Sequence, residues 1–214
     1  MPAANSRPAN PSSFDSSDEE DDQQADLSTF EISWLDLSDV NCDEKLGICG
    51  LPGCRFKDTW RSLKHDLSCM KNSGVEDVFC LCSNGELNKY RVPRLLQEYG
   101  DADIDVHRYS FPDGEVPSMG LLMKMLEDIR TNLMKPKKTV VHCYGGLGRS
   151  CLVAVCLMML MDENLAAEEA IVKMRELRGQ RAIQTVKQYN FINEFRQQLE
   201  KYKSENISPR SLSR

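Results

Sequence analysis

The segment TVVHCYGGLGRSCLVAVCLMML, residues 139–160, decides the fold of this chain. A run rich in β-branched residues ends at His142, a loop with three glycines follows, and an apolar helical run begins near Arg149. A strand, a loop and a helix in succession are typical of α/β proteins, in which helices cross over a central sheet. The segment therefore predicts an α/β fold.

Short β-rich runs alternate with helical patterns in the rest of the domain. Strands are expected at residues 30–37, 46–51, 75–82, 104–109 and 139–142. Helices are expected where apolar residues recur on one face, over residues 122–133, 170–177 and 189–199. The predicted fold class is α/β, with a central, mostly parallel, twisted sheet flanked by helices.

The two ends of the chain differ in composition from the middle. Residues 1–26 are rich in Ser, Pro, Asn and acidic residues and almost lack aliphatic side chains, so burial cannot offset their ordering entropy. Residues 204–214 are also polar. We expect a disordered acidic tail at 1–26, one domain at 27–203 and a second disordered tail at 204–214.

Composition narrows the classes of function. The formal net charge of −6 argues against a nucleic acid as the main partner. No apolar run reaches the roughly 18 residues that span a bilayer, so no membrane segment is expected. Nine cysteines without an N-terminal signal pattern favour a reducing compartment. The expected location is the cytoplasm, including the perinuclear region.

Two cysteine pairs have a spacing that raises the question of a metal. They are Cys49/Cys54 and Cys80/Cys82, but the histidines of the chain are isolated and no further pair completes a tetrahedral set. We interpret these four residues as buried structural cysteines and expect no metal site.

The loop of residues 142–150, HCYGGLGRS, combines the parts of an anion-binding site. Glycines allow backbone N–H groups to turn toward an oxyanion, and the helix N-terminus adds roughly half a positive charge. In such a field Cys143 is expected to be an ionised nucleophile. Arg149 supplies a planar fork for two anion oxygens. The alternative, a glycine turn around a buried cysteine, explains neither the arginine nor its spacing.

The pattern His-Cys-x5-Arg-Ser resembles the signature of the protein tyrosine and dual-specificity phosphatase superfamily. Within it, the segments FDSSDEE, LPGCRFKD, HCYGGLGRSCLVA and AIQTVKQYNFINEF are similar to the cyclin-dependent kinase-associated phosphatases. The resemblance covers nearly the whole chain. It implies a cysteine-phosphatase fold and a cell-cycle function, with a cyclin-dependent kinase phosphorylated on its activation segment as partner and substrate. Phosphothreonine is the implied target, with phosphoserine and phosphotyrosine as further substrates.

The resemblance also implies a general acid on a loop before the nucleophile. Asp113, in the segment Phe-Pro-Asp-Gly that follows the strand 104–109, is the candidate. A plain Pro-Asp-Gly turn is the structural alternative. Asp101, Asp103 and Asp105 are weaker candidates because they precede or enter a strand.

Further roles follow from the same resemblance. His142 is expected to orient the loop, Ser150 to donate a hydrogen bond to the leaving sulfur, and Gln184, with Gln188, to position the hydrolytic water. Exposed positions on a helix are the alternative for both glutamines. The phosphate is expected to bind to the loop residues Tyr144, Gly145, Gly146, Leu147, Gly148 and Arg149.

These assignments predict two-step hydrolysis through a phosphocysteine, without a cofactor or metal, by a monomer. One rival is a catalytically weak module that binds the phosphorylated kinase. Another is a phosphoinositide or RNA 5′-phosphatase, disfavoured by a loop without Lys or His between Cys143 and Arg149. Substrate docking is expected on the outer face of a C-terminal helix, residues 185–202, through Lys187, Asn190, Asn193, Glu194, Gln197 and Lys201.

Overall fold

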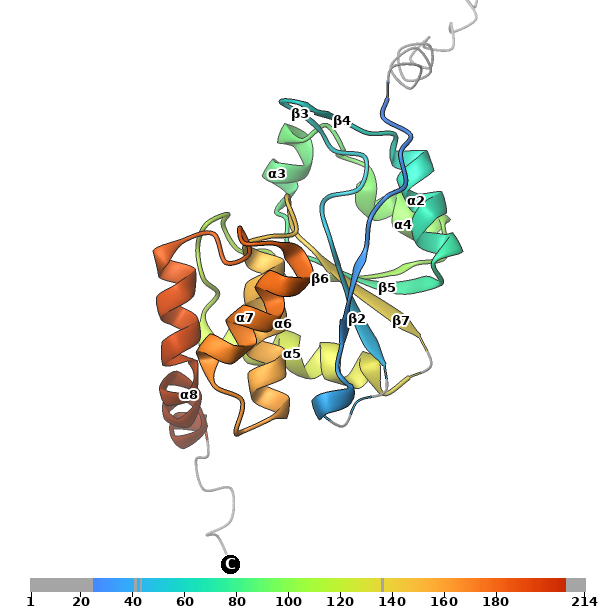
Figure 1. Ribbon diagram of the computed structural model, residues 1–214. Helices are drawn as coiled ribbons and strands as arrows, with labels where there is room; N and C mark the ends of the chain where they lie inside the picture. Colours follow the sequence, from blue (N-terminus) through green and yellow to red (C-terminus); the bar gives the residue numbers. More distant parts are fainter. Residues whose placement is uncertain (1–24, 41, 43, 136, 207–214) are drawn as a thin grey trace, which may run out of the picture.

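The computed structural model describes residues 25–40, 42, 44–135 and 137–206. Its centre is a five-stranded sheet in the order β1-β2-β7-β5-β6 (Figure 1). The strands are β1 (Ser33–Asp36), β2 (Lys45–Cys49), β5 (Val75–Cys80), β6 (Asp105–Arg108) and β7 (Lys138–His142). Only β1 is antiparallel to its neighbour, so the predicted mostly parallel sheet is confirmed.

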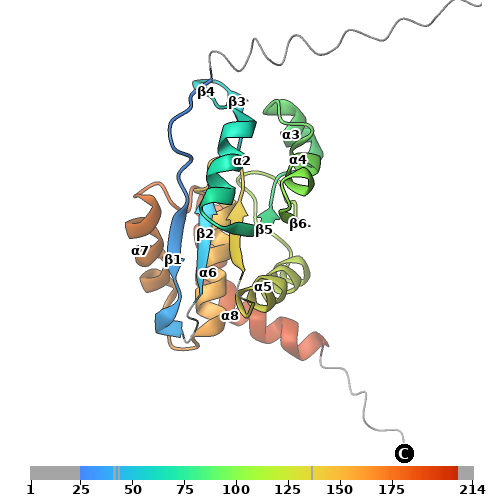
Figure 2. The same cartoon turned by 90° about the vertical axis from the view of Figure 1, so that its right-hand side faces the viewer.

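Helices cover both faces of the sheet, which leaves its middle strands buried on both sides (Figure 2). One layer contains α5 (Met119–Leu133), α6 (Arg149–Met161), α7 (Ala167–Arg178) and α8 (Val186–Asn206). The other contains α2 (Leu63–Asn72), α3 (Asn84–Lys89) and α4 (Leu95–Asp101). Helix α6 is apolar all round, and residues 149–159 of it are all buried, as the central segment predicts.

A small hairpin lies outside the main sheet. It consists of β3 (Arg55–Phe56) and β4 (Thr59–Trp60), which pair with each other. A short 3-10 helix, η1 (Ser38–Val40), follows β1. Neither element was expected from the sequence, since both are too short to show a period.

The predicted tails need two corrections. Residues 204–206 form the last turn of α8, so the expectation of disorder there is wrong. Asp26 is also ordered, because its backbone N–H donates to the Trp60 carbonyl at 2.7 Å and its carboxylate pairs with Arg61. Residues 1–24 and 207–214 lie outside the described residues, so the rest of both predictions stays untested.

Candidate active site

The loop after β7 presents Cys143 at the carboxyl edge of the parallel strands (Figure 1). The first residues of the loop are hydrogen-bonded to the segments that follow the neighbouring strands β5 and β2. Leu81 N–H donates to the His142 carbonyl at 3.0 Å, and Leu51 N–H donates to the Tyr144 carbonyl at 2.9 Å. Cys143 is 2% exposed. The loop ends where α6 begins at Arg149, so the positive end of the α6 dipole faces the thiol.

Of the three loop glycines, Gly146 is required by its surroundings, whereas the atom nearest to a Cβ on Gly148 is the end of an exposed, flexible glutamine side chain. Gly146 has a φ of +64°, and a Cβ there would lie 2.3 Å from the Cys49 carbonyl oxygen. A Cβ on Gly148 would lie 2.8 Å from Gln184 Oε1. Gly145 is exposed and a Cβ on it would meet no atom within 4 Å. The close approach of the loop to β2 therefore depends on Gly146, and Gly145 leaves room for a side chain.

Arg149 is completely buried and is held from several sides. Its Nη2 and Nη1 donate to the carboxylate of Glu86 at 2.6 and 3.1 Å. Nη1 also donates to the carbonyls of Leu81 at 3.1 Å and Phe111 at 3.0 Å. Burial alone lowers the pKa of Arg149, but the Glu86 carboxylate outweighs it and the pKa is raised. The guanidinium is thus a fixed cation behind the loop.

Glu86 is a site residue that sequence reasoning missed. It lies at the third position of α3, where its carboxylate accepts from Ser83 N–H at 2.9 Å while Ser83 Oγ accepts from Glu86 N–H at 3.3 Å. This reciprocal pair is a capping box, and Ser83-x-x-Glu86 after β5 was the signal available in the sequence. Burial raises the pKa of Glu86, yet hydrogen bonds from Arg149 and Ser83 prevail and the pKa is lowered.

Asp113 lies beside the same arginine. Its Oδ1 is 3.2 Å from Arg149 Nη2, and its side chain is 53% exposed. The Asp113 segment is anchored to the start of α8, because Thr185 Oγ1 donates to the Gly114 carbonyl at 3.0 Å and Lys187 pairs with Glu115. A cavity of about 360 Å³ opens there, lined by Ser83, Glu86, Lys89, Tyr90, Ser110, Phe111, Pro112 and Asp113.

The other aspartates considered lie at the wrong edge of the sheet. Asp105 begins β6 and is aligned with Asp77 near the start of β5, whereas Cys143 follows the end of β7. Asp101 ends α4, and Asp103 lies in the turn before β6. Only Asp113, which follows β6, reaches the edge that carries the cysteine.

His142 is the last residue of β7 and is completely buried. One ring nitrogen, Nε2, is 3.0 Å from the Tyr99 hydroxyl, and Nδ1 is 3.4 Å from the Cys143 carbonyl oxygen. The imidazole thus spans the gap between α4 and the loop backbone, a geometry suited to orienting the loop. Tyr99 was not predicted, because nothing in its local sequence distinguishes it from a core tyrosine.

Two polar atoms near the loop stand without a hydrogen-bond partner in the described part of the chain. They are Ser150 Oγ and Arg149 Nε, both buried. Gln184 is exposed with Oε1 beside Gly148, while Gln188 is 1% exposed and its Oε1 accepts from Gln184 N–H at 3.0 Å. Of the two glutamines, Gln184 has the accessible side chain and Gln188 supports the turn.

An aromatic wall flanks the loop. The Tyr144 ring stacks on Tyr90 with centroids 4.2 Å apart, and Phe56 meets both rings edge-on. Burial raises the pKa of Tyr90 to about 12, with a smaller contribution from the carboxylates of Glu86 and Asp113. Tyr90 therefore stays a neutral phenol and forms one side of the cavity that contains Asp113.

The four cysteines considered as metal ligands, Cys49, Cys54, Cys80 and Cys82, are all buried. Within the described ranges, no group of three or more His, Cys, Asp or Glu side chains has a geometry that could hold a metal ion. Among the helices described, none is both long and apolar enough to cross a membrane.

Comparison with solved structures gives the class of the protein. A crystal structure of Tk-PTP in its active form matches with a TM-score of 0.60 at 26% identity, covering 72% of this chain and 93% of that one. The shared fold, with Cys143 and Arg149 at opposite ends of one loop, makes the chain a cysteine-dependent phosphatase of the tyrosine and dual-specificity class.

Sequence comparison places it within that class. Residues 5–171 match the cyclin-dependent kinase inhibitor 3 family, and the chain belongs to this family. A relative named Cyclin-dependent kinase inhibitor 3, from Rattus norvegicus, is 49% identical over 95% of this chain and 96% of its own length. A crystal structure of kinase associated phosphatase, with its catalytic site cysteine replaced by serine, matches with a TM-score of 0.79 at 46% identity, covering 82% and 98% of the two chains.

Proposed function

We propose that this chain hydrolyses phosphothreonine on the activation segment of a cyclin-dependent kinase, and also accepts phosphoserine and phosphotyrosine. The observation that carries the proposal is the position of Arg149, fixed between Glu86 and Asp113 behind the Cys143 loop. The kinase as partner rests on the family name and on the printed name of the structural relative, kinase associated phosphatase.

In the first step, Cys143 Sγ attacks phosphorus in line, and the bond from phosphorus to the substrate oxygen breaks. The backbone N–H groups of residues 144–148 and the Arg149 guanidinium hold the three equatorial oxygens. Asp113 donates its proton to the departing oxygen. The product is a phosphocysteine and a free hydroxyl on the protein substrate.

In the second step, a water attacks the phosphocysteine and the sulfur–phosphorus bond breaks. The Asp113 carboxylate takes the proton from the water, and Gln184 orients that water. Ser150 Oγ, which has no hydrogen-bond partner among the described residues, donates to the sulfur as it leaves. His142, hydrogen-bonded to the Tyr99 hydroxyl, holds the loop in position. The charge that a metal ion supplies in other phosphatases comes here from Arg149 and the α6 N-terminus.

Substrate charge favours a singly phosphorylated protein. The loop residues Tyr144, Gly145, Gly146, Leu147 and Gly148 bring no cation, so the loop itself offers nothing to offset the added charge of an inositol polyphosphate or an RNA 5′-triphosphate. The alternative is that the chain binds the phosphorylated kinase without hydrolysing it. The presence of Asp113 disfavours this alternative, since binding alone needs no acid near the leaving oxygen. We further propose that the protein acts as a monomer in the cytoplasm, including the perinuclear region.

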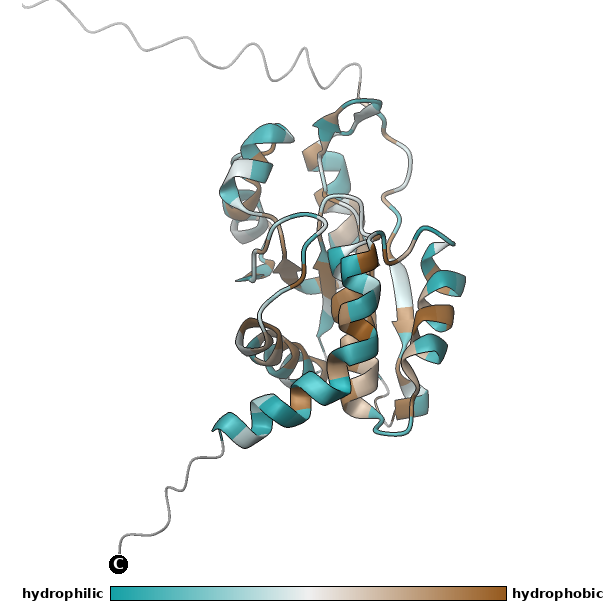
Figure 3. Ribbon diagram, turned by 90° about the vertical axis from the view of Figure 1, so that its left-hand side faces the viewer, coloured by the Kyte–Doolittle hydropathy of each residue, from teal (hydrophilic) through white to brown (hydrophobic). Residues whose placement is uncertain are grey.

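Docking on the outer face of α8 would supply selectivity that the small loop lacks (Figure 3). The expected docking residues Lys187, Asn190, Asn193, Glu194, Gln197 and Lys201 are all exposed. Among them, the Lys187 ammonium also pairs with Glu115, in the segment that carries Asp113. Contacts remote from the reacting phosphate can orient it and so raise turnover as well as affinity.

The test compares kcat/KM on a folded, threonine-phosphorylated cyclin-dependent kinase, its phosphopeptide and a phosphoinositide. The folded kinase should be the best substrate and the phosphoinositide the worst.

Asp113→Asn should slow phosphothreonine hydrolysis by about 10²–10⁴-fold, with little effect on p-nitrophenyl phosphate, whose leaving group needs no proton. Asp105→Asn is the matched control. Equal rates for wild type and Asp113→Asn on the kinase would remove Asp113 from the mechanism.

A further inference from the structure

The loop of residues 143–149 depends on groups outside it for the orientation of its peptide units. In a trans peptide, the carbonyl and the N–H of the following residue point in opposite directions. A loop carbonyl that faces a neighbouring segment therefore directs the next N–H into the loop, toward a bound anion. The carbonyls of Tyr144, Gly146 and Leu147 all face outward in this way.

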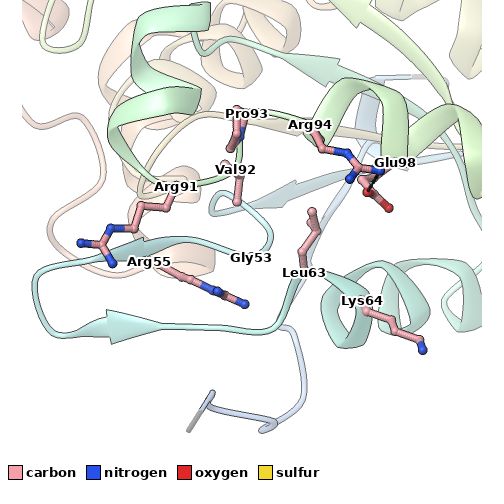
Figure 4. A pocket seen from close by; sticks show the side chains of 9 residues that line it. All are labelled: Gly53, Arg55, Leu63, Lys64, Arg91, Val92, Pro93, Arg94 and Glu98. Atoms are coloured by element: carbon pink, nitrogen blue, oxygen red, sulfur yellow. Dashed lines mark ion pairs between the residues drawn. The ribbon is translucent and has the colours of Figure 1, made fainter. Parts of the chain in front are cut away.

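Backbone groups hold two of these carbonyls. Leu51 N–H donates to the Tyr144 carbonyl, and Ile183 N–H donates to the Leu147 carbonyl, both at 2.9 Å. The segment that carries Leu51 is itself anchored, because the N–H of Gly53, labelled in Figure 4, donates to a buried carboxylate of α2 at 2.8 Å. Such backbone donors do not depend on the identity of a side chain.

A side chain holds the third carbonyl, that of Gly146. Arg178, the last residue of α7, donates from Nε to this carbonyl at 3.2 Å, and from Nη1 to Ser33 Oγ at 2.9 Å. Cys151 Sγ lies 3.4 Å from the same carbonyl, but a thiol is a weak donor. Because Ser33 begins β1, Arg178 links the loop to the edge strand of the sheet.

The charge of Arg178 is not neutralised by a carboxylate in the part of the chain that the structure describes. Its hydrogen bonds go to a carbonyl and a hydroxyl, whereas Arg149 pairs with Glu86. Burial raises the pKa values of Cys49 and Cys151, which lie beside the loop, and the Arg178 charge opposes this effect on both thiols. The positive field of Arg178 therefore extends across the back of the loop and favours an anion within it.

We propose that Arg178 is a positioning residue of the phosphatase reaction, which keeps the Leu147 N–H directed at the phosphate. It acts through the Gly146 carbonyl, on the side of the loop that faces away from the anion. Glycine has no Cβ to restrict its backbone, so this peptide unit needs a fixed partner more than its neighbours do. The role of the loop N–H groups rests on the proposed function, and the assignment of Arg178 goes beyond it.

The first measurement is inhibition by inorganic phosphate, which probes the loop without a docking surface. R178M removes the donor and the charge, and should raise the inhibition constant about 10–100-fold, the usual effect of losing a hydrogen bond to a charged group. R178K keeps the charge without the planar fork and should restore part of that affinity. R181Q removes a charge at an exposed position nearby and should stay within about twofold. With p-nitrophenyl phosphate, R178M should lower kcat as well as raise KM, because the loop N–H groups bind the transition state more tightly than the substrate.

Backbone amide NMR separates positioning from a general loss of structure. Added phosphate should shift the amide signals of Gly145, Leu147 and Gly148 in the wild type, because each of these N–H groups follows an outward carbonyl. In R178M only the Leu147 response should shrink, since both backbone anchors remain. S33A frees one arm of the guanidinium without removing it, so it tests the same contact if R178M does not fold. It should weaken the Leu147 response alone.

Three results would overturn the assignment of Arg178. The first is a Leu147 response to phosphate that is the same in the wild type, R178M and S33A. The second is an equal rise of the inhibition constant in R178M and R181Q, because net charge alone would then explain it. The third is a joint loss of all three amide responses, which would make the arginine merely structural. A wild type that neither binds phosphate nor hydrolyses p-nitrophenyl phosphate would refute the proposed function together with this inference.

Discussion

Replacing Glu86 by Gln should impair both stability and turnover, although Glu86 itself need not touch the phosphate. The wild-type carboxylate accepts two hydrogen bonds from Arg149. The Arg149 side chain is 0% exposed and the Glu86 side chain is 15% exposed. Glutamine preserves the shape and one acceptor, but it removes the charge that compensates a buried guanidinium.

The expected size follows from that burial. Removing one partner of a fully buried ion pair costs about 3–5 kcal/mol. Because Glu86 retains some exposure and glutamine one acceptor, we expect a loss of about 2–3 kcal/mol, or a fall in Tm of about 4–12 °C for a chain of this size. If the misoriented Arg149 stabilises the transition state by about 1.4–2.8 kcal/mol less, kcat/KM falls about 10–100-fold.

The stability difference between wild type and Glu86→Gln should depend on pH in a defined direction. The pKa of Glu86 in the folded protein lies below its usual value, because Arg149 and Ser83 donate hydrogen bonds to its carboxylate. The pairing therefore stabilises the fold above that usual value and is lost as pH falls through the folded pKa. The stability gap between wild type and Glu86→Gln should therefore be full at pH 7 and shrink below about pH 4.5.

The assay combines thermal unfolding from pH 3 to 8 with kcat and KM on a phosphopeptide. Glu127→Gln is the matched control, because Glu127 pairs with Arg130 at 3.6 Å on an exposed face of α5 and should change stability by less than about 1 kcal/mol. If Glu86→Gln behaved like Glu127→Gln in both measurements, the argument that Glu86 fixes Arg149 would be refuted.

Three further predictions concern the loop and the docking helix. Cys143→Ser should abolish turnover while retaining phosphate binding by calorimetry, since an alcohol is not ionised at neutral pH; measurable hydrolysis would point to another nucleophile. Gly146→Ala should lower kcat/KM by at least about 10²-fold, because its Cβ would meet a backbone carbonyl at 2.3 Å, whereas Gly145→Ala should stay within about twofold. Charge reversals at Glu194 and Lys201 should lower kcat/KM several-fold on the folded kinase only; equal losses on the phosphopeptide would contradict docking there.

The sequence predicted the central strands well because their physical signal is strong. Strands buried on both faces appear as continuous apolar runs, and β5 and β7 were both expected at nearly their observed positions. The predicted strand at 30–37 is shorter in the structure, since β1 pairs on one side only and its register with β2 covers Ser33–Asp36.

Weakly periodic elements were missed for an equally physical reason. Helix α3 has six mostly polar residues and a single buried side chain, Leu87, so no apolar stripe can form. The β3–β4 hairpin has two residues in each strand and turns through Lys57 at a φ of +54°. Both elements are stabilised by tertiary contacts, which local periodicity cannot reveal, and α3 lines the cavity beside Asp113.

Some site residues could be recognised from local sequence, and others are brought together only by the fold. Cys143 and Arg149 share one short segment, so their chemistry can be recognised from spacing, whereas Arg149 and Glu86 lie 63 residues apart and His142 and Tyr99 lie 43 apart. The sheet order explains why Glu86 could still have been found. Since β5 and β6 are parallel to β7, polar residues that follow any of these strands meet at one edge, as Glu86 and Asp113 do. Tyr99 comes instead from within a helix, where a buried phenol looks like any core residue, and only the packing of α4 against the sheet brings its hydroxyl to His142.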